Sequence, residues 1–348
     1  SLPPTMLTTD AEESQADQAL RGLLGWHRAM KIGMVSVTGG HFRESMDYRN
    51  PTAQLIAVSH ATRTVGDAIF KPNTPRHKLG ITEAGVRYVH DRARTDGYVH
   101  GAQQNLVSAM VRGEWKAREE RRFLSLLIRQ EMVDTKLSPV LAYLGGRMKL
   151  SSSWNLSSNV ARNYRYPTLN DRFWIPGGNP DLKPELSHSA EMNLNWLPQP
   201  RRRDNRRSFS VGGYYNHVDD WILWVPGTGA VWHPENVRKV NALGIEANAS
   251  LGGEALRRRL QYQLLASYTF NRSHDQDGYQ LIYTPQHLAF ARLYLKWKSL
   301  DLQYFQDWNS RRYTVADNSA FVKGFTTGDL TLGWRRQRST RLDIKAVP

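Results

Sequence analysis

The residue types that could support catalysis or metal binding are dispersed along this sequence. There is no Cys, which excludes disulfides, thiolate nucleophiles and Cys-based metal centres. The 11 His residues include no pair at the i, i+2 or i, i+4 spacing that metal ligands commonly share. We find no Ser-His-Asp arrangement, no glycine-rich phosphate loop and no paired carboxylates in a recognisable frame. The sequence therefore predicts a protein that is not an enzyme and that holds no cofactor and no metal ion.

The densest group of residues with special backbone chemistry lies between Arg165 and Glu185. Gly177-Gly178 permits positive φ, and Asn179-Pro180-Asp181 is typical of turns. Four prolines each remove a backbone donor from any strand ladder: Pro167, Pro176, Pro180 and Pro184. This segment must be a structured loop that leaves one strand and enters the next.

The elements on either side of that loop alternate apolar with polar residues. From about Gln103 onward the period is two, in segments of roughly ten residues, which is the pattern of a transmembrane β-barrel. Trp and Tyr stand near the ends of these segments, where a membrane–water interface would be. We expect one set to face lipid: Tyr262, Leu264, Ala266, Leu293, Leu295, Leu302 and Leu332. We expect another set to face the lumen: Gln261, Gln263, Ser267, Asp301 and Gln303.

The connections between these segments alternate in length. Ser299 and the segment from Gly252 to Leu256 are short turns. Longer polar connections are expected at Pro226 to Arg238, Ser273 to Gln280 and Tyr313 to Lys323. Short periplasmic turns and long outer loops are typical of outer-membrane barrels. The number of turns predicts about 14 to 16 strands in this chain.

The charge pattern also follows this alternation. The formal net charge of +15 would by itself be compatible with a nucleic-acid partner. Counting turns instead gathers most basic clusters on one rim: Lys116, Arg118, Arg121, Arg122, Arg147, Lys149, Arg201, Arg202, Arg203, Arg206, Arg207, Arg257, Arg258, Arg259, Lys298, Arg335, Arg336, Arg338 and Arg341. The opposite loops carry Asp134, Asp171, Asp181, Asp275, Asp277 and Asp317. Such a basic rim either contacts membrane phosphates or forms solvated turns, and we expect no nucleic-acid partner.

Two other classes of protein compete with the barrel. The chain has no run of about 18 apolar residues, which excludes a transmembrane helix. A soluble β-rich protein is the alternative from composition. As a function class, a soluble basic β-protein that binds nucleic acid would be purified without detergent.

The first hundred residues are less regular. Trp26 to Val37 and His41 to Tyr48 could form a strand pair around Gly39-Gly40. Asp10 to Leu24 has few β-formers and is expected to be a loop or a short helix. We therefore divide the chain into residues 1–102, with N-terminal barrel strands and loops, and residues 103–348, the more regular barrel. The given sequence contains no signal peptide and both of its ends look cut, so we expect a fragment of a longer protein.

Two segments carry a family resemblance. The first is SNVARNYRYPTLND from Ser158, followed by PGGNPDLKPE from Pro176. It resembles the barrel signature of TonB-dependent outer-membrane receptors, an aromatic-Arg-x-Pro-Thr-Leu stretch followed by Gly-Asn-Pro-x-Leu-x-Pro-Glu. The second, NVRKVNALGIE from Asn236, is similar to the start of a later strand in that family. The matching residues of the signature are Arg165, Pro167, Thr168, Leu169, Asn170, Asp171, Gly178, Asn179, Pro180, Leu182, Pro184 and Glu185, and Glu191 follows where the family often has another Glu.

The resemblance implies a fold and a function. The expected fold is an all-β, antiparallel, up-and-down transmembrane barrel in the outer membrane of a Gram-negative bacterium, incomplete at about 14 to 16 of 22 strands. The expected function is TonB-coupled uptake of a scarce nutrient such as a ferric siderophore or cobalamin, with TonB acting through a plug. The chain departs from the family because it contains no plug, no TonB-binding segment and no closing strand. Expected partners are TonB, a small-molecule ligand, membrane lipid and lipopolysaccharide. The alternative is a passive porin or a structural barrel without coupling.

The resemblance also suggests roles for individual residues. One interpretation is that the signature residues only shape the loop. In the other, Arg165, Asp171, Asn179 and Glu185 also contact ligand or plug. Glu185 and Glu191 would be costly against lipid, so we expect them to face the lumen or the loop base and to contact the plug. We expect Arg165 to hold the loop by pairing with Asp171 or Asp181.

Overall fold

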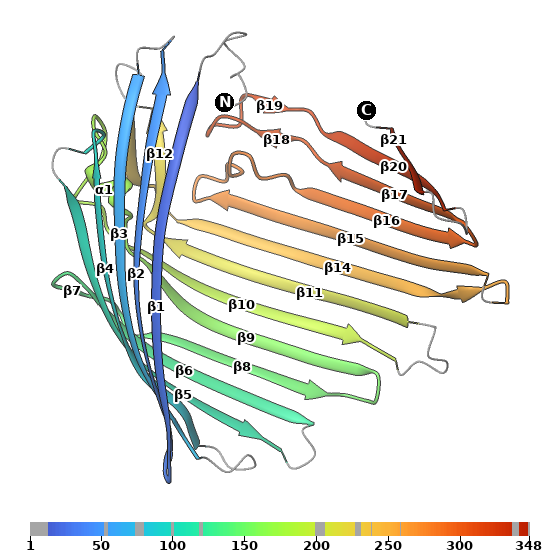
Figure 1. Ribbon diagram of the computed structural model, residues 1–348, viewed down its shortest axis with the longest axis horizontal. Coiled ribbons are helices and arrows are strands. Elements are labelled where there is room, and N and C mark those ends of the chain that lie inside the picture. Colours follow the sequence, from blue (N-terminus) through green and yellow to red (C-terminus); the bar gives the residue numbers. More distant parts are fainter. Residues whose placement is uncertain are drawn as a thin grey trace.

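The computed structural model describes residues 13–346, except residues 52–54, 74–79, 99–100, 118–120, 199–205, 227–230, 238, 258 and 336–340 (Figure 1). The described chain is almost entirely β-structure, built around one antiparallel sheet of 17 strands. Without the two-residue strand β7 the sheet has 16 strands. This is the upper limit of the 14 to 16 strands predicted from the sequence. The all-β, antiparallel fold class is confirmed.

The first half of the sheet contains the longest strands. Its elements are β1 (Ser14–Met30), β2 (Gly33–Asn50), β3 (Leu55–Pro72), β4 (Gly80–Thr95), β5 (Ala102–Lys116), β6 (Arg122–Val133), β7 (Lys136–Leu137), β8 (Leu141–Lys149) and β9 (Trp154–Arg165). The second half continues with β10 (Glu185–Trp196), β11 (Arg206–Asp219), β14 (Val240–Ala255), β15 (Leu260–Asp275), β16 (His287–Trp297), β17 (Leu300–Asn309), β20 (Phe325–Arg335) and β21 (Arg341–Ala346).

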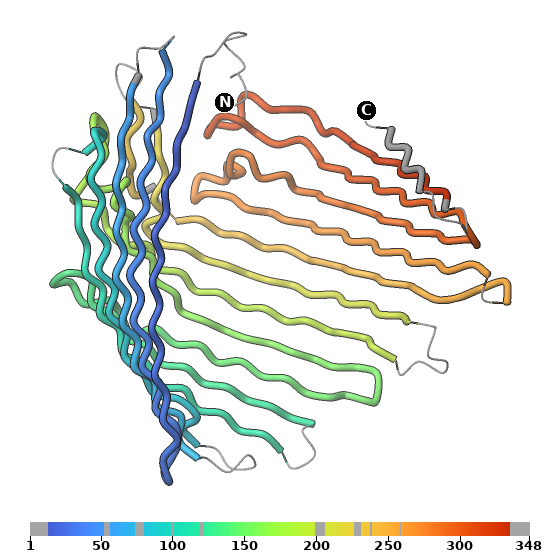
Figure 2. The backbone as a smooth tube through the Cα atoms, viewed as in Figure 1, coloured from blue at the N-terminus to red at the C-terminus, as the bar shows by residue number. Residues whose placement is uncertain are grey.

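The strands follow one another as an up-and-down meander. Each long strand pairs with the next long strand of the chain, from β1–β2 through β20–β21. The tube in Figure 2 shows a curved wall. Among the described residues no register pairs β1 with β21, so the wall has two free edges. The described chain forms part of a barrel wall, in agreement with the predicted incomplete barrel.

The remaining elements all lie at one end of the sheet. Helix α1 (Leu169–Phe173) lies between β9 and β10, and the hairpin β12 (Trp221–Pro226) with β13 (Trp232–Val237) lies between β11 and β14. The two-residue strands β18 (Arg312–Tyr313) and β19 (Phe321–Val322) lie between β17 and β20. In an up-and-down sheet these connections share an end with β7, which we call the loop end (Figure 1). The opposite end, where Lys31-Ile32 and Lys298-Ser299 connect strands, is called the turn end.

The register divides the sheet into two faces. Leu264 is opposite Leu293 on β16 and Leu251 on β14, and Leu302 is opposite Leu295 and Leu332. On the other face Gln263 is opposite Tyr294, and Asp301 is opposite Lys296. The two sets of side chains predicted to face lipid and lumen therefore lie on opposite faces. Because an apolar face of this size is stable only against lipid, we call these the membrane face and the lumen face.

The membrane face continues across the whole sheet. Large apolar side chains on it are exposed, among them Val86, Val111, Leu126, Leu144, Val160, Met192, Ile245 and Leu332. The chain has no helix among its described residues that is long and apolar enough to cross a membrane.

Two expectations for the first fifty residues were wrong. The segment expected to be a loop or short helix is strand β1 from Ser14 onward, because its full ladder with β2 outweighs weak β-propensity. Residues 10–12 of that segment lie outside the described residues. The expected turn at Gly39-Gly40 is the middle of β2, and the real turn is Lys31-Ile32. Gly40 has a packing role, since a Cβ there would lie 2.9 Å from the Phe42 ring.

Two connections differ in detail from expectation. The short turn expected at Gly252 to Leu256 begins only at Leu256, because β14 continues to Ala255, and Leu256 and Arg257 have positive φ. The long connection expected from Pro226 to Arg238 is largely the β12–β13 hairpin. The turn at Lys298-Ser299 lies where it was predicted.

Candidate functional site

The signature loop, residues 166–184, joins the last residue of β9 to the first residue of β10. Arg165 and Glu185 are opposite each other in the β9–β10 register. Helix α1 begins after Thr168, whose hydroxyl accepts a hydrogen bond from the Asp171 backbone N–H at 3.1 Å. The Asp171 carboxylate accepts in return from the Thr168 N–H at 2.9 Å. This reciprocal cap explains why Thr-Leu-Asn-Asp folds as a helical turn there.

Arg165 and Glu185 form the base of the loop. Arg165 Nε donates to Glu185 Oε2 at 2.6 Å, and a second guanidinium nitrogen contacts Glu185 Oε1. The Ile222 backbone N–H donates to the same carboxylate at 2.8 Å. Glu185 is buried, so these three donors replace the water that the carboxylate loses. Bidentate geometry fixes the direction in which the chain leaves the sheet.

Asp171 is a second buried acid at the same place. One of its oxygens lies 3.7 Å from Arg165 Nη1, and the other accepts from Trp224 Nε1 at 2.9 Å. Arg165 therefore pairs with Asp171, one of the two partners expected for it, and with Glu185. Asp181 is exposed, and its N–H donates to Asn179 Oδ1 at 3.0 Å.

The β12–β13 hairpin packs on the signature loop. Asn236 Oδ1 accepts from the Lys183 N–H at 2.8 Å, and Asn236 Nδ2 donates to the Lys183 and Asp220 carbonyls at 2.9 and 2.8 Å. A Cβ on Gly177 would lie 2.1 Å from the Trp232 carbonyl oxygen, so only glycine allows this approach. The two segments that carried the family resemblance are thus in contact.

The β4–β5 connection and the β6–β8 hairpin hold the other side of the loop. Tyr98 donates to Asn170 Oδ1, and its ring meets Trp174 edge-on with centroids 6.3 Å apart. Burial, and then the nearby Asp171 charge, raise the pKa of Tyr98. Arg172 lies 3.6 Å from Asp134 and 4.7 Å above the Phe173 ring. Contacts from three neighbouring connections therefore fix the loop.

The other predicted loop residues shape its interior and its tip. Pro167 and Leu182 are buried, whereas Thr168, Asn170 and Pro180 are exposed. The intermediate positions are Leu169, Gly178, Asn179 and Pro184. A Cβ on Gly178 would lie 2.5 Å from the Trp174 nitrogen. Sequence reasoning missed four residues of the site. Tyr98, Ile222 and Trp224 lie in other connections of the chain and contact the loop from there. Arg172 lies within the loop, but its partner Asp134 is distant in the sequence.

A groove of about 590 Å³ lies where the signature loop meets the lumen face of the first five strands. Tyr166 and Leu169 line it from the loop side. On the wall side are two ion pairs, Arg21–Glu44 at 2.8 Å and Arg63–Asp91 at 2.6 Å. This groove offers charged and aromatic groups to an occupant of the lumen.

Glu191 lies on the lumen face, away from the loop. It is exposed and accepts a hydrogen bond from Asn159 Nδ2 at 3.1 Å.

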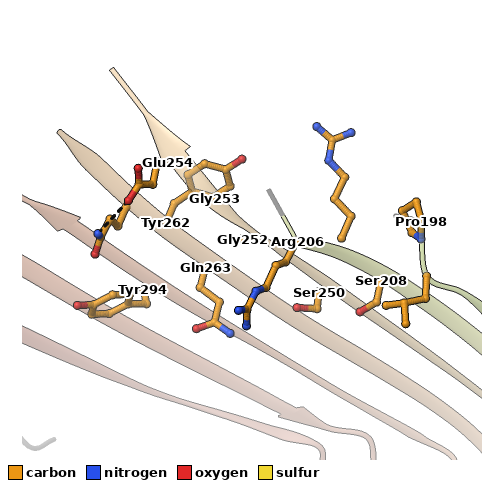
Figure 3. A pocket seen from close by; sticks show the side chains of 13 residues that line it. Pro198, Arg206, Ser208, Ser250, Gly252, Gly253, Glu254, Tyr262, Gln263 and Tyr294 are labelled. Atoms are coloured by element: carbon orange, nitrogen blue, oxygen red, sulfur yellow. Dashed lines mark hydrogen bonds between the residues drawn. The ribbon is translucent and has the colours of Figure 1, made fainter. Parts of the chain in front are cut away.

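A larger groove, of about 930 Å³, lies near the turn end (Figure 3). Its lumen-face residues include Ser208 opposite Ser250 and Gly252 opposite Gln263. Both places present polar groups to the lumen.

The charges on the two rims follow the expected division. The described members of the basic cluster lie at or next to the turn end, including Lys116, Arg122, Arg147, Arg207 and Lys298. The six aspartates expected in the outer loops lie at the loop end or in its connections. The cluster members outside the described residues are Arg118, Arg201, Arg202, Arg203, Arg258, Arg336 and Arg338.

Comparison with known proteins identifies the family. The family model described as "TonB dependent receptor-like, beta-barrel" matches residues 47–346. Among curated proteins, the vitamin B12 transporter BtuB of Vibrio vulnificus is 32% identical over 112 residues, which are 28% of this chain and 17% of that protein. BtuB of Photobacterium profundum is 31% identical over 120 residues, or 33% of this chain and 19% of that protein.

Solved structures show the same fold. The siderophore receptor PirA from Acinetobacter baumannii superposes with a TM-score of 0.69 at 15% identity, covering 93% of this chain and 57% of that one. The copper transporter OprC gives a TM-score of 0.69 at 17% identity, covering 96% and 59%. The chain thus spans a little over half the length of these proteins. The chain belongs to the family of TonB-dependent receptor β-barrels and is an outer-membrane protein of a Gram-negative bacterium.

Proposed function

We propose that the protein takes up a scarce nutrient across the outer membrane by a TonB-coupled mechanism, with cobalamin or a ferric siderophore as substrate. The family match over residues 47–346 carries this proposal. Similarity above 30% identity to two vitamin B12 transporters makes cobalamin the first substrate to test. The role is transport without catalysis.

The site supports a receptor that grips ligand at its loop end. The signature loop is held by the ion pairs of the buried Glu185 and Asp171 carboxylates with Arg165 and by contacts from three connections, which makes it a fixed platform beside the lumen. A wall of 17 strands exceeds the eight that side chains alone can fill, so a barrel built with it encloses a lumen wide enough to hold a plug. TonB would act on such a plug, contributed by a part of the protein outside this chain.

Specific residues are proposed to contact the plug. Glu191 is exposed on the lumen face, where its carboxylate can pair with a basic group of the plug. Glu185 also lies on that face, but its carboxylate is already bound by Arg165 and Ile222. Its contribution to a plug contact would therefore come mainly through the position of the loop. Lipid and lipopolysaccharide are proposed partners of the membrane face.

The alternative is a passive porin or structural barrel. A porin needs a continuous water-filled lumen, and uptake through it would rise linearly with substrate concentration and would not depend on TonB. The polar lumen face by itself suits both functions, so transport kinetics must distinguish them.

The test uses the complete gene product that contains this chain, expressed in cells lacking their own cobalamin and siderophore receptors. Uptake of radiolabelled cyanocobalamin and of ferric siderophores is measured with and without TonB. We expect uptake of one of the two substrate classes to be saturable, and we expect this uptake to be lost in cells that lack TonB. Equal, non-saturable uptake without TonB would support the porin. No high-affinity binding of either substrate class would contradict the proposed substrates.

A further inference from the structure

The turn end of the membrane face carries a row of tryptophans. Trp115, Trp154, Trp196, Trp297 and Trp334 all lie within two residues of a strand end at this rim. The register places each on the apolar face: Trp115 opposite Leu124, Trp196 opposite Phe209, Trp297 opposite Leu260 and Trp334 opposite Leu300. Trp154 is opposite Trp196, and their ring centroids are 6.3 Å apart. Indole rings prefer the level of lipid headgroups, so this row marks where the hydrocarbon ends.

Three cations lie at the level of these rings on the same face. Arg122 is opposite Met148, and Arg207 is opposite Leu251, so both side chains leave the sheet toward the membrane. Lys298 Nζ lies 5.1 Å from the centroid of the Trp297 ring. All three residues are exposed. Among the described residues, no carboxylate forms an ion pair with any of them.

Lys116 and Arg147 of the same rim face the lumen instead. Lys116 Nζ lies 5.5 Å from the Phe123 ring centroid and 3.9 Å from Glu114. The Arg147 guanidinium lies 5.9 Å from the same ring. Phe123 is opposite Arg147 and Lys116 on the lumen face. Lys116 and Arg147 thus contact a ring on the lumen face, whereas Arg122 and Arg207 point from the sheet toward lipid and Lys298 lies beside the Trp297 ring on the membrane face.

We propose that Arg122, Arg207 and Lys298 bind the phosphate groups of anionic phospholipids in the leaflet at the turn end. Long cationic side chains next to the hydrocarbon boundary can extend to headgroup phosphates, while the neighbouring indole rings pack on the lipid glycerol region. At about 4.8 Å per strand, the cations are about 15 to 20 Å apart along the rim, which is too far for one headgroup. Each cation therefore takes its own lipid, and the rim enriches anionic lipid along the wall.

This inference rests on the membrane orientation in the proposed function, but not on the substrate or on TonB. The complete gene product is reconstituted in phosphatidylcholine vesicles, without substrate. Brominated phosphatidylglycerol or brominated phosphatidylethanolamine is then titrated in, and the quenching of tryptophan fluorescence is measured. Because the cations lie beside tryptophans, lipid bound there quenches efficiently. We expect phosphatidylglycerol to be preferred by up to about fivefold, as one cation near a headgroup allows.

The matched variants separate the two sides of the rim. The triple variant Arg122→Gln, Arg207→Gln and Lys298→Gln should lose the preference, whereas Lys116→Gln with Arg147→Gln should keep it. Raising the salt concentration should weaken the preference of the unmodified protein, which tests the idea without a variant. Equal quenching by both lipids in the unmodified protein, or a preference kept by the triple variant, would overturn the proposal. Loss of co-purified lipopolysaccharide in the triple variant would also overturn it, because the cations would then face the other leaflet.

Discussion

Arg165 ends one strand and Glu185 begins the next, and they meet side by side at the first register position of the β9–β10 pair, with Arg165 Nε 2.6 Å from Glu185 Oε2. The 19 residues between them, residues 166–184, fold back over this pair, since Asp171 also lies 3.7 Å from Arg165. The conformational entropy lost on closing a loop rises only slowly with its length once its two ends are held together. The Arg165–Glu185 ion pair holds these ends together, so we infer that it helps to keep residues 166–184 ordered.

Replacing Arg165 with Ala should detach the loop from the wall. Glu185 is 8% exposed and would keep only the Ile222 N–H as donor. Because Arg165 itself is about half exposed, we expect a loss of roughly 2 kcal/mol, below the cost of breaking a fully buried pair. Chemical denaturation and limited proteolysis of residues 166–184 measure this loss. A double-mutant cycle with Glu185→Ala should show strong coupling, and additive single effects would refute the pairing role.

Trp224→Phe tests the second buried acid. The substitution keeps the aromatic packing and removes the indole N–H that donates to Asp171 Oδ1 at 2.9 Å. A hydrogen bond to a charged group contributes about 1.5 to 3 kcal/mol, so loop stability should fall by an amount in this range. Trp221→Phe, on the same hairpin, is the control. Equal effects of the two substitutions would show that packing, and not the hydrogen bond, is responsible.

The sequence predicted the sheet well because strand alternation leaves a local signal. Leu264 and Gln263 could be assigned to opposite faces without coordinates, since a period of two allows no other arrangement. Strand β1 was missed because its residues are held by long-range pairing with β2, which propensity does not report. The Gly39-Gly40 pair misled in the same way, because glycine within a strand and glycine in a turn look alike in sequence.

The loop was predicted as a loop, but most of its partners were not. Prolines and the Thr-x-x-Asp cap are local features that identify a structured turn. The contacts from Tyr98, Trp224 and Asn236 come from segments that lie about 50 to 70 residues away. Nothing in a single sequence reports such contacts. The pairing of Arg165 with Asp171 could be predicted from the sequence, because the two residues are only six positions apart.

High pH should release the side of the loop held by Tyr98. Its raised pKa means that the folded state favours the neutral phenol, which donates to Asn170. The contribution of Tyr98 to stability is therefore complete below the pKa of about 10 of an unfolded tyrosine and is lost as pH rises through the higher folded value. Proteolysis of residues 166–184 should accelerate above pH 10. Tyr98→Phe should remove this pH step, and Tyr279→Phe, in another connection, should keep it.

The two faces of β15 predict opposite responses to a charge. Leu264→Arg places a cation among Leu293 and Leu251 on the membrane face, which should destabilise the barrel by about 2–4 kcal/mol if the residue is near the midplane. Gln263→Arg places the same charge on the lumen face and should be tolerated. Folding into lipid vesicles, followed by heat-modified migration on a gel, measures both. Equal tolerance would count against the membrane face.

Glu191 and Glu185 predict different defects, because one carboxylate is free to meet a partner in the lumen and the other is bound within the wall. Glu191→Ala removes an exposed charge whose contact in the structure is Asn159, so the barrel should fold and bind substrate normally. If Glu191 positions the plug, energised uptake should fall several-fold while binding is kept. Glu185→Ala should instead weaken the loop, and substrate binding should fall together with uptake.

The variants are made in the complete gene product, with binding to isolated outer membranes and TonB-dependent uptake measured separately. Unchanged uptake in Glu191→Ala would remove this residue from the plug contact, and loss of folded barrel in Glu185→Ala would assign Glu185 a purely structural role.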